Sequence, residues 1–341
     1  MTKISWGVIS TARIGLEKVI PAMQKGEYSA VGAISSREYA KAKNAADKLR
    51  IPKAYGSYEE LLNDKEIQAV YIPLPNHLHV EWTLKSLKAG KHVLCEKPIT
   101  MNFKDALYLQ KEIRKFPGLK VMEAFMYRFH PQWKKVKALI DEGAIGKLKN
   151  IHSMFSYFNT NPDDIRNKAE IGGGGLLDIG CYCINLSRFV FNKEPESVFG
   201  SIEYDLNLKI DRLVSGVLNF KLNDKTGEKG TATFTCSTQL ANNQGAEIFG
   251  TEGKIKIEIP FTPMPGMKPK IIHQRGAEIT ETKFDSCNQY TIQGDQFSLA
   301  VLNGSDVPTS FDDAVYNMKV IQSVFDSPSS KTHRKKRAFS K

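Results

Sequence analysis

The sequence has few of the features that mark secreted, membrane or metal-dependent proteins. Its five cysteines include no C-x-x-C pair, so we expect reduced thiols that pack inside the protein rather than disulfides or zinc ligands. It contains no apolar run of about 18 residues or more, and its first residues show no charged leader with a cleavage site. We therefore expect a cytoplasmic protein with no membrane partner.

A surplus of positive charge is the unusual feature of the composition. The chain has 48 Lys and Arg against 37 Asp and Glu, a formal net charge of +11. Part of the excess lies in a basic tail, residues 331–341, and the remaining cations are interspersed with acids rather than arranged in a stripe. We therefore expect no nucleic-acid partner, and a phosphorylated small molecule becomes the candidate anion.

The 341 residues are enough for about two domains. Over the first 120 residues, short β-branched runs alternate with longer amphipathic stretches, which predicts βαβ units and a parallel sheet. We place a dinucleotide-binding Rossmann domain at 1–122. The expected strands are 4–10, 28–35, 69–72, 92–95 and 120–124. The expected helices are 13–24, 36–49, 57–62, 79–88 and 102–116, with Thr100 as the N-cap of the last one.

After about residue 150 the pattern changes to many strands with few long helices between them. This pattern predicts an α+β domain at 123–330, built on an open, mainly antiparallel sheet. The expected strands are 151–158, 197–204, 213–222, 230–240, 246–249, 254–259, 270–274 and 278–284. Two closing helices are expected at 291–303 and 312–325.

The turn after the first strand occupies the place of a dinucleotide fingerprint, G-x-G-x-x-G. Its residues are Ser10, Thr11, Ala12, Arg13, Ile14 and Gly15. Only the third glycine is present, but Ser10 and Ala12 are small enough for the backbone to approach a pyrophosphate closely. An ordinary strand–turn–helix connection is the alternative.

The end of the second strand bears on the choice of nucleotide. Ser35, Ser36 and Arg37 stand where an NAD site places an acidic residue for the ribose 2′-hydroxyl. Hydroxyls and a cation suit a 2′-phosphate, so NADP is favoured and NAD is the alternative. Both serines are also compatible with a simple helix cap.

Three segments resemble the Gfo/Idh/MocA oxidoreductase family. They are Pro75-Asn76-His77-Leu78-His79, the run 89–98 that contains Glu96-Lys97-Pro98, and the glycine-led run 173–185. The resemblance implies cofactor contacts from Pro75, Asn76, His79, Glu96 and Lys97. It also implies that the second domain binds the substrate and forms a homodimer or homotetramer through its sheet.

Lys97 is the first of three expected catalytic residues. It follows the strand expected at 92–95, at the edge where ligands bind in open α/β sheets. A lysine in a partly desolvated cleft can hydrogen-bond or exchange a proton with a substrate hydroxyl. The alternative is an ordinary surface lysine in a loop.

Asp178 and Tyr182 are the other two expected catalytic residues. They are four positions apart, so on an α-helix both would point toward one substrate. Most family members carry His at the position of Tyr182. The tyrosine resembles the branch with glucose-fructose oxidoreductase, NADP-dependent xylose dehydrogenase and dimeric dihydrodiol dehydrogenase. Lys97 would favour the phenolate of Tyr182, although a tyrosine packed with its hydroxyl satisfied is the alternative.

Three further residues are candidate substrate contacts. Tyr127 and Arg128 lie in a segment that resembles the family's domain-joining region, and Arg166 precedes the glycine run. A structural ion pair is the alternative for Arg166. His77 and His79 lack a third ligand in range, so we expect no metal.

Together these observations predict an NADP-dependent oxidoreductase. We expect hydride transfer between nicotinamide and a hydroxyl or carbonyl carbon of a pyranose sugar or cyclic trans-diol. Two alternatives remain from the same family: a non-catalytic, dinucleotide-binding regulatory protein, and an NAD-assisted glycosidase.

Overall fold

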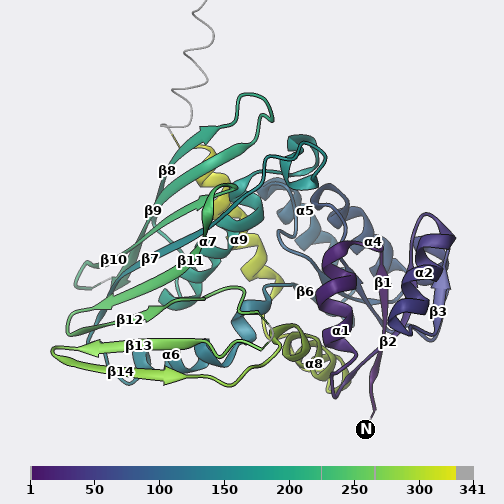
Figure 1. Ribbon diagram of the computed structural model, residues 1–341, viewed down its shortest axis with the longest axis horizontal. Coiled ribbons are helices and arrows are strands. Elements are labelled where there is room, and N and C mark those ends of the chain that lie inside the picture. The colour runs from purple at the N-terminus through teal and green to yellow at the C-terminus, as the bar shows by residue number, and fades with distance from the viewer. Residues whose placement is uncertain (1, 224, 265, 328–341) are drawn as a thin grey trace, which may run out of the picture. The chain divides into compact units, whose positions relative to one another are not determined.

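The computed structural model describes residues 2–223, 225–264 and 266–327, which form two compact units (Figure 1). Of the described residues, unit 1 comprises 2–129 and Asn288–Val315, and unit 2 comprises those in His130–Cys287 and 316–327. The units therefore differ from the contiguous segments 1–122 and 123–330 that we expected. The basic tail at 331–341 lies outside the described residues.

Unit 1 is built on a parallel sheet with the strand order β3-β2-β1-β4-β5-β6. The order reverses between β1 and β4, which is where dinucleotides bind in doubly wound folds. The expected Rossmann architecture is confirmed. The strands are β1 (Ile4–Ile9), β2 (Ser29–Ser35), β3 (Lys53–Tyr55), β4 (Ala69–Ile72), β5 (His92–Cys95) and β6 (Val121–Glu123).

Unit 1 also contains helical segments, most of which connect these strands. They are η1 (Gly15–Val19), α1 (Ile20–Met23), α2 (Tyr39–Leu49), α3 (Tyr58–Asn63), η2 (Asn76–Leu78), α4 (His79–Lys88), α5 (Phe103–Ile113), η3 (Met126–Phe129) and α8 (Gln289–Leu302). The N-cap of α5 is Asn102 rather than Thr100, because the Asn102 side chain accepts from the backbone N–H of Asp105 at 2.9 Å. Strand β3 was not predicted, since three half-buried residues are too few to show a period.

Helix α8 explains why the late segment Asn288–Val315 belongs to unit 1. The indole N–H of Trp6 in β1 donates to the Ser298 hydroxyl at 3.0 Å, and the Trp6 and Phe297 rings lie 5.2 Å apart. The Asp295 carboxylate accepts from the backbone N–H groups of Glu27 and Tyr28, at 2.8 and 2.9 Å. These hydrogen bonds join residues more than 260 positions apart, so no local pattern could reveal them.

Unit 2 is built on an eight-stranded sheet with the order β14-β13-β12-β11-β7-β10-β9-β8, seen as the green and teal arrows of Figure 1. Every neighbouring pair is antiparallel except β7 and β10, which confirms the mainly antiparallel sheet. The strands are β7 (Leu148–Phe158), β8 (Ser197–Tyr204), β9 (Asp211–Asn223), β10 (Glu228–Ser237), β11 (Gln239–Gly250), β12 (Gly253–Ile257), β13 (Lys270–Arg275) and β14 (Glu278–Lys283).

The helical segments of unit 2 include two that were not predicted, α6 (Pro131–Asp141) and α7 (Cys181–Phe191). Ten of the eleven residues of α7 are buried, so it lacks the amphipathic period that marks a surface helix. A π-helical turn, η6 (Leu176–Gly180), leads directly into α7. The remaining segments are η4 (Ile165–Asn167), η5 (Ala169–Ile171) and α9 (Phe311–Phe325), which starts in unit 1 and ends in unit 2. No helix among the described residues has the length and apolarity to cross a membrane.

Candidate active site

The carboxyl edge of the parallel sheet in unit 1 brings together the predicted cofactor residues. The segments that contain Ser10, Ser36, Pro75 and Lys97 follow β1, β2, β4 and β5, and all these strands point the same way. In this fold class the dinucleotide binds at this edge, near the reversal between β1 and β4. The topology therefore agrees with the cofactor site expected from the sequence.

Ser10 takes the place of the first glycine of the fingerprint. Its φ of 104° lies in the region that normally requires glycine. Its hydroxyl accepts from the backbone N–H of Ala12 at 3.3 Å, and its own N–H donates to the Ser35 carbonyl at 3.1 Å. A short polar side chain can thus hold the tight turn that glycine usually permits.

The rest of the turn is accessible. Thr11, Ala12 and Ile14 are half-buried, and Arg13 is exposed with its guanidinium 4.0 Å from the Glu17 carboxylate. The backbone N–H of Leu16 already donates to the Ala12 carbonyl, which starts the helical segment after the turn. The N–H groups of a helix start attract phosphate, as the sequence analysis assumed.

The residues after β2 divide into a buried pair and an exposed cation. The Ser35 hydroxyl donates to the Val8 carbonyl at 3.2 Å, and the Ser36 hydroxyl accepts from the Glu38 N–H at 3.4 Å. Glu38, not a serine, occupies the N-cap position of α2. Arg37 is exposed and lies beside Tyr58, where burial raises the pKa of the phenol and the guanidinium opposes that rise. Arg37 thus presents an exposed, positively charged donor group beside the buried serines.

The loop after β4 contains the predicted contacts Pro75, Asn76 and His79. Pro75 and Asn76 are half-buried at the start of η2. His79 is fully buried, and its two ring nitrogens face the Leu74 and Pro98 carbonyls at 2.8 and 2.9 Å. Its ring therefore joins two loops of the protein, and any contribution of His79 to cofactor binding passes through those loops.

Lys97 follows β5 and is half-buried. The residue before it is held by the Tyr71 hydroxyl, which donates to Oε1 of Glu96 at 2.6 Å. The peptide after it, Lys97–Pro98, is cis. The backbone N–H of Ile99 then donates to Oε1 of Glu123, at the end of β6, at 2.7 Å. Lys97 is thus presented at the carboxyl edge on a fixed backbone.

In unit 2, Asp178 lies in a cluster of polar side chains. The Tyr157 hydroxyl donates to Oδ2 of Asp178 at 2.6 Å, and Nε of Arg166 lies 3.4 Å from the same oxygen. Arg166 also pairs with Asp164, whose Oδ1 lies 3.3 Å from a guanidinium nitrogen. The structure thus brings Arg166 and Asp178 together as an ion pair and adds Tyr157, which the sequence analysis missed.

Tyr182 lies in the first turn of α7 and is only 5% exposed. Its ring packs against those of Phe155 and Phe261, with centroids 5.6 and 5.5 Å away. Because Asp178 belongs to the π-helical turn η6, the spacing of four does not place it on one α-helical face with Tyr182. The expectation that α-helical spacing points both side chains toward one substrate is therefore wrong in its premise, because the turn at Asp178 is π-helical.

Asp211 shapes the glycine run that precedes Asp178. Its Oδ2 accepts from the backbone N–H of Leu176 at 2.5 Å. Gly174 has a φ of 118°, and a Cβ there would lie 2.0 Å from Oδ1 of Asp211, so only glycine fits. Burial raises the pKa of Asp211 to about 7. Asp211 begins the distant strand β9, and no motif in the sequence points to it.

Tyr127 and Arg128 lie in η3 of unit 1. Tyr127 is fully buried, with its ring 6.1 Å from that of Phe125. Arg128 donates to Oδ2 of Asp313 at 2.8 Å. These contacts give both side chains a structural role within the protein, and their contact with substrate stays a prediction.

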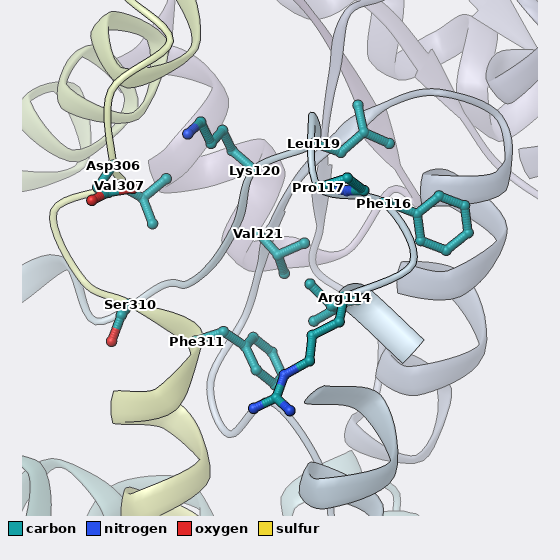
Figure 2. A pocket seen from close by; sticks show the side chains of 11 residues that line it. Arg114, Phe116, Pro117, Leu119, Lys120, Val121, Asp306, Val307, Ser310 and Phe311 are labelled. Carbon is teal, nitrogen blue, oxygen red and sulfur yellow. The ribbon is translucent and has the colours of Figure 1, made fainter. Parts of the chain in front are cut away.

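A cavity of about 460 Å³ in unit 1 is distinct from the candidate site. Figure 2 shows its lining side chains, which come from the end of α5, the loop into β6 and the segment before α9. Lys120 and Val121 place it at the amino end of β6, opposite the edge that carries Lys97. Within the described ranges, no three His, Cys, Asp or Glu side chains are grouped as metal ligands would be.

Comparison with known proteins agrees with this architecture. Residues 4–124 match the family described as "Oxidoreductase family, NAD-binding Rossmann fold", and residues 133–256 match the "GFO/IDH/MocA C-terminal domain". The chain is 33% identical to D-xylose 1-dehydrogenase (NADP(+)) 2 of Haloferax volcanii, over 94% of this chain and 96% of that protein. It is 37% identical to trans-1,2-dihydrobenzene-1,2-diol dehydrogenase of Xenopus laevis, over 82% of this chain and 80% of that protein.

A solved structure extends the likeness to the whole fold. A 3-ketoreductase from Actinomadura kijaniata, in complex with NADP and TDP-benzene, has a TM-score of 0.86 and 29% sequence identity. The match covers 96% of this chain and 98% of that protein. With the parallel sheet, the open antiparallel sheet and the Glu96-Lys97-Pro98 segment in place, the chain belongs to the Gfo/Idh/MocA family of oxidoreductases.

Proposed function

We propose that this oxidoreductase uses NADP to oxidise or reduce one carbon of a pyranose sugar or a cyclic trans-diol. The observation that carries the proposal is the position of Lys97, half-buried on a fixed backbone at the edge where the cofactor candidates gather. The relatives named above act on a sugar and on a diol, and the solved neighbour contains NADP. These three observations favour turnover over binding alone.

The residues present fit a phosphorylated dinucleotide. We propose that the turn from Ser10 to Ile14 binds the pyrophosphate, because its backbone leads into a helix start at the strand-order reversal. Arg37 would bind the 2′-phosphate, since its exposed guanidinium stands at the end of β2 and no acidic residue occupies that end. Bound NADP would supply or accept the hydride.

We propose that Tyr182 exchanges the proton of the reacting hydroxyl and that Lys97 favours the phenolate by its charge. Asp178 would orient the substrate hydroxyls. Its Oδ2 is already engaged by Tyr157 and Arg166, which restrict the rotation of the carboxylate. Arg166 then acts on the substrate through Asp178 as well as by any contact of its own.

A substrate panel tests this proposal. Pyranoses, cyclic diols and a dTDP-sugar are incubated with NADP or NAD, and the absorbance of reduced nicotinamide is followed. We expect reduction of NADP with at least one sugar or diol, and loss of turnover in Lys97→Met. Cofactor binding without turnover on the whole panel would contradict the proposal and favour a regulatory protein. Glycoside cleavage without added nucleotide would favour an NAD-assisted glycosidase.

We also propose that the protein forms a homodimer or homotetramer through the open face of the eight-stranded sheet. One row of that face crosses the sheet as Phe199, Val217, Thr233 and His152, which are paired strand to strand. Phe199 is 54% exposed, and the row has few charges to oppose association. Analytical ultracentrifugation of wild type and Val217→Glu is the test, and a wild-type monomer would overturn the proposal.

A further inference from the structure

The backbone around Lys97 is fixed by side chains from three other elements of unit 1. Tyr71 in β4 binds the side chain of Glu96, His79 in α4 faces the carbonyl of Pro98, and Glu123 in β6 binds the N–H of Ile99. We propose that these three residues, the Lys97 clamp, are positioning residues that hold the Lys97 ammonium where the reaction needs it. The inference rests on the proposed function of Lys97.

Glu123 holds the backbone two residues after Lys97. It is 3% exposed, and its Oε1 accepts from the Ile99 N–H at 2.7 Å, a short distance typical of a charge-assisted hydrogen bond. Such a bond is roughly twice as strong as one between neutral groups. Since Ile99 is two residues after Lys97, loss of this acceptor frees the backbone directly beyond the lysine.

His79 joins the Lys97 segment to the loop after β4. Burial lowers the pKa of His79 to about 4, so the ring is neutral at pH 7 and carries one N–H. A neutral ring donates a hydrogen bond to only one of the two carbonyls, Leu74 or Pro98, although both lie close to a ring nitrogen. The buried ring thus lies between the two loops at the carboxyl edge and against Pro98, the residue next to Lys97.

Tyr71 fixes the residue on the other side of Lys97. Its hydroxyl is inside the protein and donates to Oε1 of Glu96 at 2.6 Å. Burial and the Glu96 charge hold the pKa of Tyr71 well above its usual value, so the phenol stays protonated and remains a donor. The residues on both sides of Lys97 thus have buried contacts with other elements of unit 1, which restrict where the lysine can lie.

The clamp acts on catalysis because small displacements of a reacting group are costly. A misplacement of about 1 Å can lower a rate about a hundredfold. A purely structural role would instead lower the stability and leave the turnover of the folded enzyme unchanged. The two roles are distinguished by comparing kcat, the dissociation constant of NADP and the thermal midpoint in the same variants.

The test uses Tyr71→Phe, His79→Asn, Glu123→Gln and Glu123→Ala, with the substrate found in the panel above. We expect kcat to fall about ten- to hundredfold in Tyr71→Phe and Glu123→Ala while the NADP dissociation constant changes less than about threefold. Glu123→Gln keeps an acceptor oxygen at the same place, so it should recover part of the kcat lost in Glu123→Ala. The alkaline limb of the kcat profile should also move in the variants, because the environment of Lys97 changes.

Ser298→Ala is the matched control. It removes two buried hydrogen bonds of the same unit, those of the Ser298 hydroxyl with Trp6 and Ser29, but leaves the Lys97 segment untouched. It should lower the thermal midpoint and keep the wild-type kcat. Wild-type kcat and pH profile in folded Tyr71→Phe and Glu123→Ala would overturn the clamp, even if the midpoint falls.

Two further outcomes separate this inference from the proposed function. Wild-type kcat in Lys97→Met would show that Lys97 has no role, which overturns the clamp but leaves the oxidoreductase activity standing. A wild-type enzyme that turns over no substrate with either nucleotide overturns both. An inactive Lys97→Met together with fully active clamp variants overturns the clamp alone.

Discussion

The hydroxyl of Tyr157 and the carboxylate of Asp178 form a hydrogen bond of 2.6 Å between the end of β7 and the π-helical turn before α7. Both burial and the Asp178 charge raise the pKa of Tyr157. The phenol therefore stays protonated and serves Asp178 as a permanent donor. Tyr157, which no sequence motif revealed, thus restricts the orientation of Asp178, which a motif did reveal.

Tyr157→Phe should lower kcat about tenfold, because a typical hydrogen bond to a charged group contributes about 1.5–3 kcal/mol and Arg166 keeps part of the restraint. The acid limb of the kcat profile should move to higher pH, since the carboxylate loses a donor. The control is Tyr55→Phe, which removes a similar bond of 2.8 Å to Asp64 in unit 1. Equal kcat values in the two variants would remove Tyr157 from the proposed site.

Arg37→Ala should raise the dissociation constant of NADP about ten- to hundredfold and leave that of NAD nearly unchanged, because only NADP carries the 2′-phosphate. Both dissociation constants are measured by nucleotide fluorescence at fixed ionic strength. Lys43→Ala, which removes an exposed cation of α2 paired with Asp47, controls for the loss of one charge. A similar loss of affinity for NAD and NADP in Arg37→Ala would show that Arg37 does not bind the 2′-phosphate.

The conformation of Ser10 leads us to expect that Ser10→Gly and Ser10→Ala differ in stability. Ser10→Gly removes the hydroxyl bond to Ala12 but relieves the φ of 104°, whereas Ser10→Ala removes the bond and keeps the conformation. Ser10→Ala should therefore be the less stable variant, by about 1 kcal/mol or more in the free energy of unfolding. Urea denaturation measures the difference, and the reverse order would contradict this account of the turn.

Asp211 predicts a pH-dependent contribution to stability. Burial raises its pKa from an ordinary value of 3.8 to about 7 in the folded state. The folded protein therefore holds a proton that the unfolded chain releases, so this contribution is full below about pH 4 and is lost as the pH rises through about 7. The free energy of unfolding of wild type relative to Asp211→Asn should decline across this window. A difference that is constant from pH 4 to 8 would show that Asp211 does not titrate there.

The sequence by itself determined the class of fold and the motifs of the candidate site. Strands β4 and β5 were predicted with their observed bounds, because a buried parallel strand reads as a short run of mainly apolar residues. Lys97, Ser10 and Arg37 were found because each lies within two residues of the end of such a strand. The strand bounds and the residues that follow each strand depend on neighbouring residues in the chain, so a local sequence pattern can predict them.

Only the tertiary structure decided which residues hold those motifs in place. Tyr157 meets Asp178 across 21 positions, Glu123 meets Ile99 across 24, and Asp295 meets Glu27 across 268. Helix α7 was missed because burial on all sides removes its period, and the return of Asn288–Val315 to unit 1 depends on distant contacts such as that between Trp6 and Ser298. The physical reason is that a buried polar group must hydrogen-bond to a group that lies near it in space. Because packing decides which groups are near, these partners cannot be predicted from their positions in the sequence.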